Sequence, residues 1–504
     1  MRSVRWRARP LSLLAPVSTV VLAVPLAAAL LVAISRTRPQ ANAVVCGAGF
    51  ASVAAVFLTI REVLNEGTAS VPTSLLYVDA LSGLLLLLVS LIGLASVLYS
   101  VDYMGRSGSP HEAAFPRLRA YYAFVMLFLF TMYLAAEANN LGILWIALEG
   151  TTLVSALLVG FYRTRRALEA SWKYLILCSV GLSFALFGTL VLYLASVRTA
   201  GPIASGLDWT TLVAVGPHLD PGLVSLAVAF LLIGYGTKAG LAPLHTWLPD
   251  AHSEAPTPVS ALLSGALLNC AMYALLRVDA ITLRIPGFTL SHWLFLGFGL
   301  VSVFVAAFFI LVQQDLKRLM AYHSVEHMGI ISVGVGFGGV LGLFGALYHT
   351  LNHAATKAAL FLAGGNLALS AGTKDLEEVS GALAALPATG AVLLVGGLAL
   401  AGVPPFSIFS SEFVILSAGF GGGNFVGALL LLVGLAIVFG GLLLHLSRLL
   451  LGPQRPRPFA PGMRSAFGAA FGIGLLVAVA VGLGLFLPDP LSQLLWAAAR
   501  VVTA

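Results

Sequence analysis

Charged residues are scarce in this chain of 504 residues, and their scarcity excludes a soluble globular protein. Asp, Glu, Lys and Arg together make up 9% of the sequence, whereas hydrophobic residues make up 59% and the mean hydropathy is +0.99. A soluble domain contains about 25% charged residues. Apolar runs long enough to cross a bilayer recur along the whole length. We therefore expect an all-α polytopic membrane protein without a sizeable soluble domain.

Cysteine motifs and nucleotide-binding loops are missing as well. Cys46, Cys178 and Cys270 lie singly in apolar segments, and the absence of any CxxC excludes an iron–sulfur or structural zinc framework. No GxGxxG follows a predicted strand, and no GxxxxGK[ST] occurs. We expect no cofactor, no resident metal and no redox centre in this chain. The net charge of +7 belongs to short basic loops and does not indicate nucleic-acid binding.

The apolar runs predict about fourteen transmembrane helices and a short amphipathic tail over 490–503. The uncharged run from Leu11 to Ser35 is longer than the apolar region of a signal peptide and lacks a clear cleavage site, so we interpret it as the first span. The expected limits are 11–34, 41–60, 74–100, 119–136, 139–161, 172–196, 222–248, 258–278, 288–312, 319–337, 339–369, 384–420, 425–449 and 464–486.

Lysine and arginine are distributed unevenly between alternate loops. The richer loops follow the first, third, fifth, ninth and thirteenth spans and hold Arg36, Arg38, Arg106, Arg117, Arg163, Arg165, Arg166, Lys317, Arg318, Arg455 and Arg457. The opposite loops hold only Arg61, Arg198, Arg277 and Arg284. By the positive-inside rule the richer loops are cytoplasmic, so both termini are expected outside the cytoplasm. The arginines of the N-terminus argue the other way: Arg2, Arg5, Arg7 and Arg9.

A lysine beside a helix break is the strongest functional signal. Lys238 follows a long uncharged stretch, and Pro243 interrupts the same helix five residues later. An amine at the bilayer centre costs about 2.5 kcal/mol or more on insertion scales. Glu149 is buried in span five, where its carboxylate either fixes helix packing as a counter-ion or forms a proton switch with Lys238.

Histidines gather in two later spans. His349, His353 and Lys357 recur every four residues on one helix face, about 6 Å apart along the axis, and can pass protons in steps. His323, Glu326 and His327 share one turn. This second group suits a polar relay better than a zinc site, because no further ligand lies nearby in sequence. Histidines that merely hydrogen-bond inside the bundle are the alternative for the first group.

Two further groups of polar residues lie beside prolines. His245, Asp250, His252 and Glu254 follow the break in span seven, where they either take part in proton transfer or form a solvated loop near the membrane interface. Glu412 comes just after the Pro404–Pro405 pair in span twelve. It is expected to be a terminal proton acceptor, a cap for the amides that the break frees, or both.

The spacing of these charges indicates an internal repeat. Glu149 and Lys238 are 238 − 149 = 89 positions apart, and Glu326 and Glu412 are 412 − 326 = 86 apart. Proline-interrupted segments at matching places are the sequence sign of inverted repeats. We expect three N-terminal helices in 1–118, a first five-helix repeat in 119–280, a second in 281–450, and a last helix with the tail in 451–504.

Three motifs resemble one known family. KAGLAPLHTWLPDAHSEAPTPVSALLSG, LKRLMAYHSVEHMGI and HTLNHAATKAALFLAGG are similar to the proton-translocating, antiporter-like membrane subunits of respiratory complex I, Mrp antiporters and group 4 hydrogenases. YHSVEHMGI and VPPFSIFSSEF most resemble the hydrogenase-4 component F type of sequence. The resemblance covers roughly spans four to thirteen. It implies fourteen helices, two inverted five-helix repeats with broken helices seven and twelve, and a central hydrophilic axis.

The resemblance also implies roles for particular residues. Glu149 and Lys238 match the glutamate of helix five and the lysine of the broken helix seven. The helix-eleven relay is matched by His349, His353 and Lys357, and Glu412 matches the ionisable position of helix twelve. The chain departs from the family at Asn269, where several complex I subunits have a lysine, so histidine and water would have to connect the two half-channels.

Two classes of function agree with these features. The first is a proton-pumping subunit of a membrane-bound redox complex in the inner (plasma) membrane, driven by other subunits because this chain has no redox centre. The second is a secondary transporter: a subunit of a cation/proton antiporter, with sodium as the second ion, or a subunit that energises inorganic-carbon uptake. A membrane scaffold that has lost transport is a weaker alternative, because five buried charges without a function would be costly.

Overall fold

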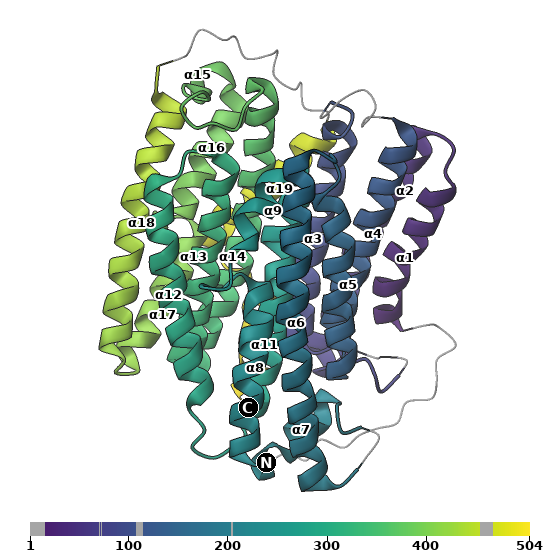
Figure 1. The fold of residues 1–504 in the computed structure, drawn as a ribbon, viewed down its shortest axis with the longest axis vertical. Coiled ribbons are helices and arrows are strands. Elements are labelled where there is room, and N and C mark those ends of the chain that lie inside the picture. Colours follow the sequence, from purple (N-terminus) through teal and green to yellow (C-terminus); the bar gives the residue numbers. More distant parts are fainter. Residues whose placement is uncertain are drawn as a thin grey trace.

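The computed structural model describes residues 16–69, 71, 73–106, 114–202, 205–453 and 467–503, and within them every long regular element is a helix. Eleven of these helices are long and apolar enough to cross a membrane. The helices stand side by side with their axes roughly parallel (Figure 1). The chain is a multi-pass membrane protein, and the all-α fold predicted from its composition is confirmed.

The helices up to the first break are continuous and mostly follow the expected limits. Before α8 the chain forms one short extramembrane helix, α7, and one turn of 3₁₀-helix, η1. Their bounds are α1 (Val17–Ile34), α2 (Arg38–Glu66), α3 (Ala80–Tyr103), α4 (Phe115–Glu137), α5 (Leu141–Val159), α6 (Arg165–Ala200), α7 (Trp209–Val215), η1 (Gly216–His218) and α8 (Pro221–Ala239).

The rest of the chain contains a second break and a turn of π-helix, η2. The bounds are α9 (Trp247–Glu254), α10 (Thr257–Leu262), η2 (Leu263–Leu267), α11 (Leu268–Thr282), α12 (Leu290–Val312), α13 (Leu316–Phe337), α14 (Gly339–Ala371), α15 (Ala382–Ala385), α16 (Pro387–Leu400), α17 (Ser407–Gly421), α18 (Phe425–Leu451), α19 (Phe467–Leu485) and α20 (Asp489–Thr503). The amphipathic tail predicted over 490–503 is the helix α20, which packs against α3 and α14.

Both proline-containing segments are broken helices, as their sequences predict. The first helix ends at Ala239, where Gly240 takes a left-handed backbone conformation with a φ of 76°, and helix resumes at Trp247. The second break separates α16 from α17. In Figure 1 the chain rises from α8 to α9 through the first break and descends from α16 to α17 through the second, so it crosses the two breaks in opposite directions.

The segment after the first break is helical, which corrects the alternative of a solvated interfacial loop. It forms α9, and Asp250 there is paired with Lys173 at 3.3 Å and with Arg318. These contacts join the starts of α6 and α13 to α9, so the basic loops before α6 and α13 lie at the same end of the bundle. Arg119 at the start of α4 also donates to Ser35 at the end of α1.

At the opposite end of the bundle the loop assignment is wrong for three arginines: Arg61 lies in α2, Arg198 in α6 and Arg277 in α11. Arg277 is not a loop residue: it lies within α11 with 2% of its surface exposed. Its guanidinium makes a bidentate ion pair with Asp79 at 2.7 and 2.8 Å. The other basic residues used for the orientation include six that lie outside the described residues: Arg2, Arg5, Arg7, Arg9, Arg455 and Arg457.

Small residues allow the helices around the breaks to approach closely. A Cβ atom on Gly234 of α8 would lie 2.4 Å from the backbone nitrogen of Ala185 in α6. On α13, a Cβ on Gly329 would lie 2.7 Å from the carbonyl oxygen of Gly299 in α12. Any larger residue would separate these pairs. Each close pair therefore supports helices that carry candidate site residues: Lys238 on α8, and the histidines of α13.

Candidate functional site

Lys238 is fully buried at the end of α8, immediately before the first break. Its ammonium donates hydrogen bonds to Thr152 Oγ1 at 2.6 Å and to the Tyr174 hydroxyl at 3.0 Å. It also lies 5.2 Å from the centre of the Tyr174 ring, a distance at which a cation is attracted to the aromatic face. The three groups come from α8, α5 and α6, so the site depends on the packing of all three helices.

Glu149 is held separately from the lysine. It lies on α5, one turn before Thr152, and its Oε1 accepts a hydrogen bond from Ser179 of α6 at 2.8 Å. Its Oε2 is buried and has no hydrogen-bond partner among the described residues. A buried carboxylate oxygen without a partner is costly unless it is protonated or hydrated. Glu149 and Thr152, the hydrogen-bond partner of the Lys238 amine, are thus neighbours along α5, and the carboxylate and the amine each contact neutral hydroxyl groups.

Two histidines lie beyond the first break. His252 of α9 has none of its surface exposed, and neither ring nitrogen has a hydrogen-bond partner among the described residues. The imidazole ring of His252 stacks on the ring of Phe361, with the two centroids 5.0 Å apart. The Lys357 ammonium lies 5.0 Å from the centre of the Phe361 ring. His245, between α8 and α9, is 6% exposed and packs edge-on against Tyr322. The structure thus brings His252 near Lys357 of α14.

A cavity of about 570 Å³ lies near these histidines, at the end of the bundle where α13 begins. It is lined by the charged residues Glu254, Lys317 and Lys374, together with Tyr103 and Ser253. Lys374 pairs with Glu254 at 3.2 Å, and Lys317 donates to the carbonyl of Ala255 at 2.8 Å. Since Ser253 and Glu254 directly follow His252 on α9, the cavity lies beside the end of the helix that carries this histidine.

The second histidine group forms one cluster between α13 and α14. His327 Nδ1 and His349 Nε2 are 2.9 Å apart, and the rings of His327 and His353 have centroids 5.1 Å apart. His349 Nδ1 also lies 3.0 Å from Ser411 Oγ of α17. Both nitrogens of His353 lack partners among the described residues. The four-residue spacing does bring His349 and His353 to one face, as the sequence predicts.

Glutamates lie on either side of this cluster. His323 Nδ1 and Glu326 Oε2 are 2.7 Å apart within one turn of α13. Glu412 of α17 is 8% exposed, and the side chain of Glu412 lies against Gly402 of the second break, where a Cβ would come within 2.3 Å of its Oε2. Lys357 donates to the carbonyl of Met320 on α13. His327, His349 and Glu412 therefore meet between α13, α14 and α17, whereas His323 lines a space shared with α16 and α18.

Metal binding fits this cluster less well than proton transfer does. His327, His349 and Glu412 offer ligand atoms within 4.8 Å of one another, and His323, Glu326 and His327 do the same. The ring nitrogens nearest to each other, however, are already paired as hydrogen-bond partners at 2.9 Å. A tetrahedral site would need a lone pair from each ring directed at a common centre. The expectation of a polar relay stays a prediction.

The link between the two halves contains no lysine. Asn269 of α11 donates to the carbonyl of Gly265 at 2.7 Å, and its side-chain oxygen is buried without a partner among the described residues. A hydrogen bond of 2.7 Å joins Ser264 of η2 to Ser324 of α13. Since Ser324 follows His323 directly, this pair of hydroxyl groups connects the helix of Asn269 with the histidine-bearing helix.

Sequence reasoning missed several buried ionisable groups, among them Arg277, Glu137 and Asp279. Arg277 was assigned to a loop, although it pairs with Asp79 inside the bundle. Glu137, the last residue of α4, has none of its surface exposed, and both carboxylate oxygens lack partners among the described residues. Its position at the end of an apolar run gave the only available signal. No hydrogen bond among the described residues links Arg277 or Glu137 to the site of Lys238 or to the histidine cluster.

The family follows from comparison with known proteins. Residues 138–439 match the family described as NADH:quinone oxidoreductase/Mrp antiporter, TM. The chain belongs to this family. It is 42% identical over 417 residues to the hydrogenase-4 component F homolog of Methylacidiphilum infernorum, a match that covers 83% of this chain and 86% of the relative. The resemblance predicted from the motifs is therefore confirmed.

More distant members show how widely the architecture is shared. The chain is 32% identical over 362 residues to Na(+)/H(+) antiporter subunit A1 of Staphylococcus haemolyticus; the match covers 68% of this chain but only 42% of that longer relative. A subunit of an archaeal membrane-bound sulfane sulfur reductase has the same fold, with a TM-score of 0.85, 22% identity and coverage of 97% of this chain and 98% of that one.

Proposed function

We propose that this chain is a proton-translocating membrane subunit of a multisubunit redox complex of the hydrogenase or NADH:quinone oxidoreductase type. The observation that carries the proposal is the buried amine of Lys238, placed beside a helix break and solvated by neutral hydroxyl groups alone. A buried amine with such partners can gain and lose a proton at moderate cost. The 42% identity to a hydrogenase-4 component F homolog supports a redox complex as the setting.

The architecture that supports this function comprises fourteen spans in two inverted five-helix repeats. Eleven spans meet the criteria of length and apolarity, the histidine-bearing α13 and α14 add two, and α16 with α17 add one broken span, giving 11 + 2 + 1 = 14. The opposite directions of the two breaks support the inversion (Figure 1). The repeats occupy residues 119–280 and 281–450, between N-terminal helices in 1–118 and a last helix with the tail in 451–504.

Protons would move along one buried axis across both repeats. In the first repeat the axis joins Glu149 of α5 to Lys238 of α8 through Thr152, which lies one turn beyond Glu149 and accepts from Lys238. The paired hydroxyl groups of Ser264 and Ser324, with water, would connect this part to the second repeat in place of the missing lysine at position 269. That connection depends on water entering a polar passage.

In the second repeat the axis consists of the histidine cluster and its flanking acids. Its members are His323, Glu326, His327, His349, His353, Lys357 and Glu412. The cavity beside Glu254 and Lys374 would admit protons to His252 and then to Lys357, while His245 would serve the first break. Imidazole suits this role because it exchanges protons near neutral pH.

The energy would come from other membrane subunits of the complex, because the sequence holds no redox or nucleotide-binding motif. The basic loops that share one end of the bundle would face the cytoplasm of a cell bounded by an inner (plasma) membrane, which places both termini outside the cytoplasm.

The second candidate is a cation/proton antiporter subunit or a subunit that energises inorganic-carbon uptake. The similarity to a Na(+)/H(+) antiporter subunit supports the antiporter form.

The test is proton pumping by inverted membrane vesicles that contain the complex with Lys238→Met in this subunit. Pumping should fall to background while the protein stays inserted at the wild-type level, and Glu149→Gln should lower it in the same direction. Lys173→Met is the matched control, because Lys173 is an exposed lysine at the start of α6 that pairs with Glu169 and Asp250. Near-normal pumping by Lys238→Met would contradict the proposal.

A further inference from the structure

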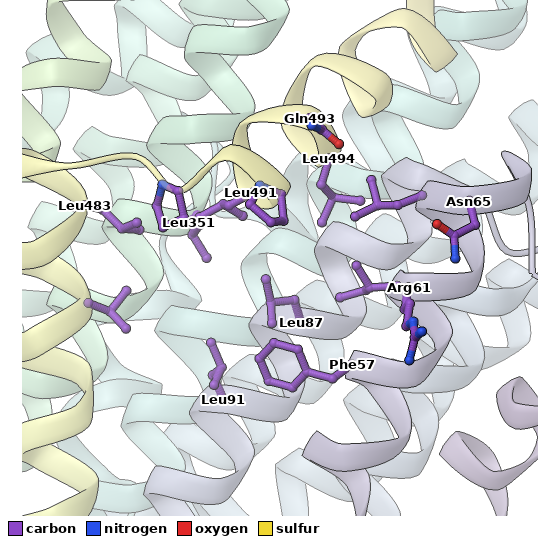
Figure 2. Close-up of a pocket in the computed structure, with 15 residues that line it drawn as sticks. Phe57, Arg61, Asn65, Leu87, Leu91, Leu351, Leu483, Leu491, Gln493 and Leu494 are labelled. Carbon is purple, nitrogen blue, oxygen red and sulfur yellow. The ribbon is translucent and has the colours of Figure 1, made fainter.

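A pocket of about 600 Å³ lies where α20 meets α2, α3, α14 and α19 (Figure 2). Its walls are mostly apolar, and Phe57, Leu87 and Leu91 lie together at the end of the pocket that is farthest from α20 in Figure 2. Pockets that bury drug-sized ligands have volumes of about 300–1,000 Å³. The volume and the lining therefore suit a flexible hydrocarbon chain.

Three polar residues line the pocket, two from α2 and one from α20. Arg61 and Asn65 of α2 line it one helical turn apart, and Gln493 of α20 lines it as well (Figure 2). Arg61 is exposed and makes no ion pair or hydrogen bond within the part of the chain that the structure describes. An unpaired guanidinium near the end of a transmembrane helix is favourable only if water or a membrane anion satisfies it.

The charge balance of the pocket favours an anion. Arg61 is the one charged residue among those that line it within the described residues. Glu62 and Glu66 lie on the same end of α2 but do not line the pocket, and Asp489, at the start of α20, does not line it either. Guanidinium groups bind phosphate through short, charge-assisted hydrogen bonds, to which side-chain amides can add further donors.

A helix from another protein fits this space poorly. The pocket is bordered on several sides by helices of the same chain, among them α2, α3, α19 and α20. An acyl chain can follow the apolar walls between α2, α3 and α19, whereas a straight helix cannot bend around α20. The combination of one unpaired cation and a narrow apolar pocket distinguishes a lipid from a protein occupant.

We propose that this pocket is a binding site for an anionic membrane phospholipid. Its phosphate would lie against Arg61, with the amide of Asn65 on the same helix as a further donor, and an acyl chain would occupy the space beside Phe57 and Leu91. The lipid would join α2, from the N-terminal helices, to α19 and α20 at the C-terminal end of the chain. This site is separate from the proton axis.

The experiment is native mass spectrometry of the purified full chain, released from mixed micelles that contain phosphatidylglycerol and phosphatidylethanolamine in equal amounts. The wild type should retain phosphatidylglycerol preferentially. Arg61→Gln should reduce that retention about tenfold relative to the wild type, because a charge-assisted hydrogen bond to phosphate is lost. Arg198→Gln is the matched control: it removes another exposed arginine from the same end of the bundle, outside the pocket, and should change nothing.

A second variant tests whether lipid binding needs the apolar space of the pocket as well as the charge of Arg61. Leu491→Trp, on α20, should fill part of the pocket and lower phosphatidylglycerol retention with Arg61 still present. Equal retention of the two lipids by the wild type would overturn the proposal, as would unchanged retention in Arg61→Gln. A photo-crosslinker at position 491 that captures another subunit instead of lipid in the intact complex would also overturn it.

Discussion

Lys238 donates its short hydrogen bond to Thr152, and Thr152 lies one turn beyond Glu149 on the same helix. The amine thus meets a hydroxyl group where the family resemblance leads one to expect a carboxylate. Glu149 accepts in turn from Ser179 through one oxygen only, and its other oxygen has no partner among the described residues. In this arrangement the amine of Lys238 is hydrogen-bonded to hydroxyl groups. A small movement of α8 along α5 would bring it to Glu149 and form an ion pair. Two arrangements of similar free energy are the physical requirement for a switch.

The first prediction concerns Thr152. Thr152→Val removes the hydroxyl group that accepts from Lys238 while keeping the shape of the side chain, so proton transport should fall about tenfold. Thr151→Val is the matched control, because the Thr151 hydroxyl is equally buried but bonds only to the carbonyl of Leu148 on its own helix. Transport in inverted vesicles at equal protein levels measures both. Similar losses in the two variants would show that the effect is structural.

The second prediction concerns the contact between His327 and His349. His349→Gln keeps a polar side chain but cannot carry a proton in imidazolium form, so it should abolish transport with little change in stability. His218→Gln is the control: His218 is an exposed histidine of η1 and lies outside the cluster. Wild-type transport in His349→Gln would exclude the histidine cluster from the path.

The sequence predicts the helices well because lipid imposes a simple rule on them. Twenty or so apolar residues must form a helix, since unpaired backbone groups are too costly in hydrocarbon. The same rule predicts the two breaks from Pro243 and from Pro404–Pro405, which lie between the observed helix ends. It does not predict that the polar segment from Trp247 to Glu254 is a helix, because that depends on the ion pairs of Asp250 across three helices.

Site residues are predictable where their spacing is local and not where their partners are distant. The stripe of His349 and His353 follows from a step of four residues. That Lys238 meets Thr152 and Tyr174 depends on contacts 86 and 64 positions away, and a single sequence does not contain them. Arg277 appeared to be a loop residue for the same reason: its partner, Asp79, is 198 positions away.

The third prediction concerns this buried ion pair. Arg277→Met should lower the free energy of unfolding by about 3–5 kcal/mol, because it leaves the Asp79 carboxylate buried without its partner. Asp79→Asn in the same chain should recover part of that loss, since no charge is then left alone. Asparagine can still accept from the amide of Ser82 and cap α3. Thermal unfolding in detergent measures the stability of the two single variants and of the double variant. If the stability losses of the single variants simply add up in the double variant, the prediction is wrong.

The fourth prediction concerns orientation. A cysteine at Arg165 should react with an impermeant maleimide added from the cytoplasmic side, and one at Ser205 should react from the other side. Cys46 is replaced by serine in both variants, because it is partly exposed, whereas Cys178 and Cys270 are buried. A third cysteine at Arg457, outside the described residues, should report the same side as Arg165. The reverse pattern would mean that the N-terminal arginines decide the orientation.

The last prediction is that this chain moves protons only within a complex. Its buried groups can form a path, but its sequence holds no motif for a redox centre or a nucleotide, so energy has to reach Glu149 and Lys238 through contacts with other subunits. A lone antiporter, by contrast, needs only an ion gradient and two ions that compete for one site.

The purified chain is therefore reconstituted alone in liposomes with an internal pH dye and an imposed sodium or potassium gradient. We expect no cation-driven proton flux above that of the Lys238→Met control. Saturable exchange that this substitution abolishes would favour the antiporter function, because the path would then be driven by the cation gradient itself.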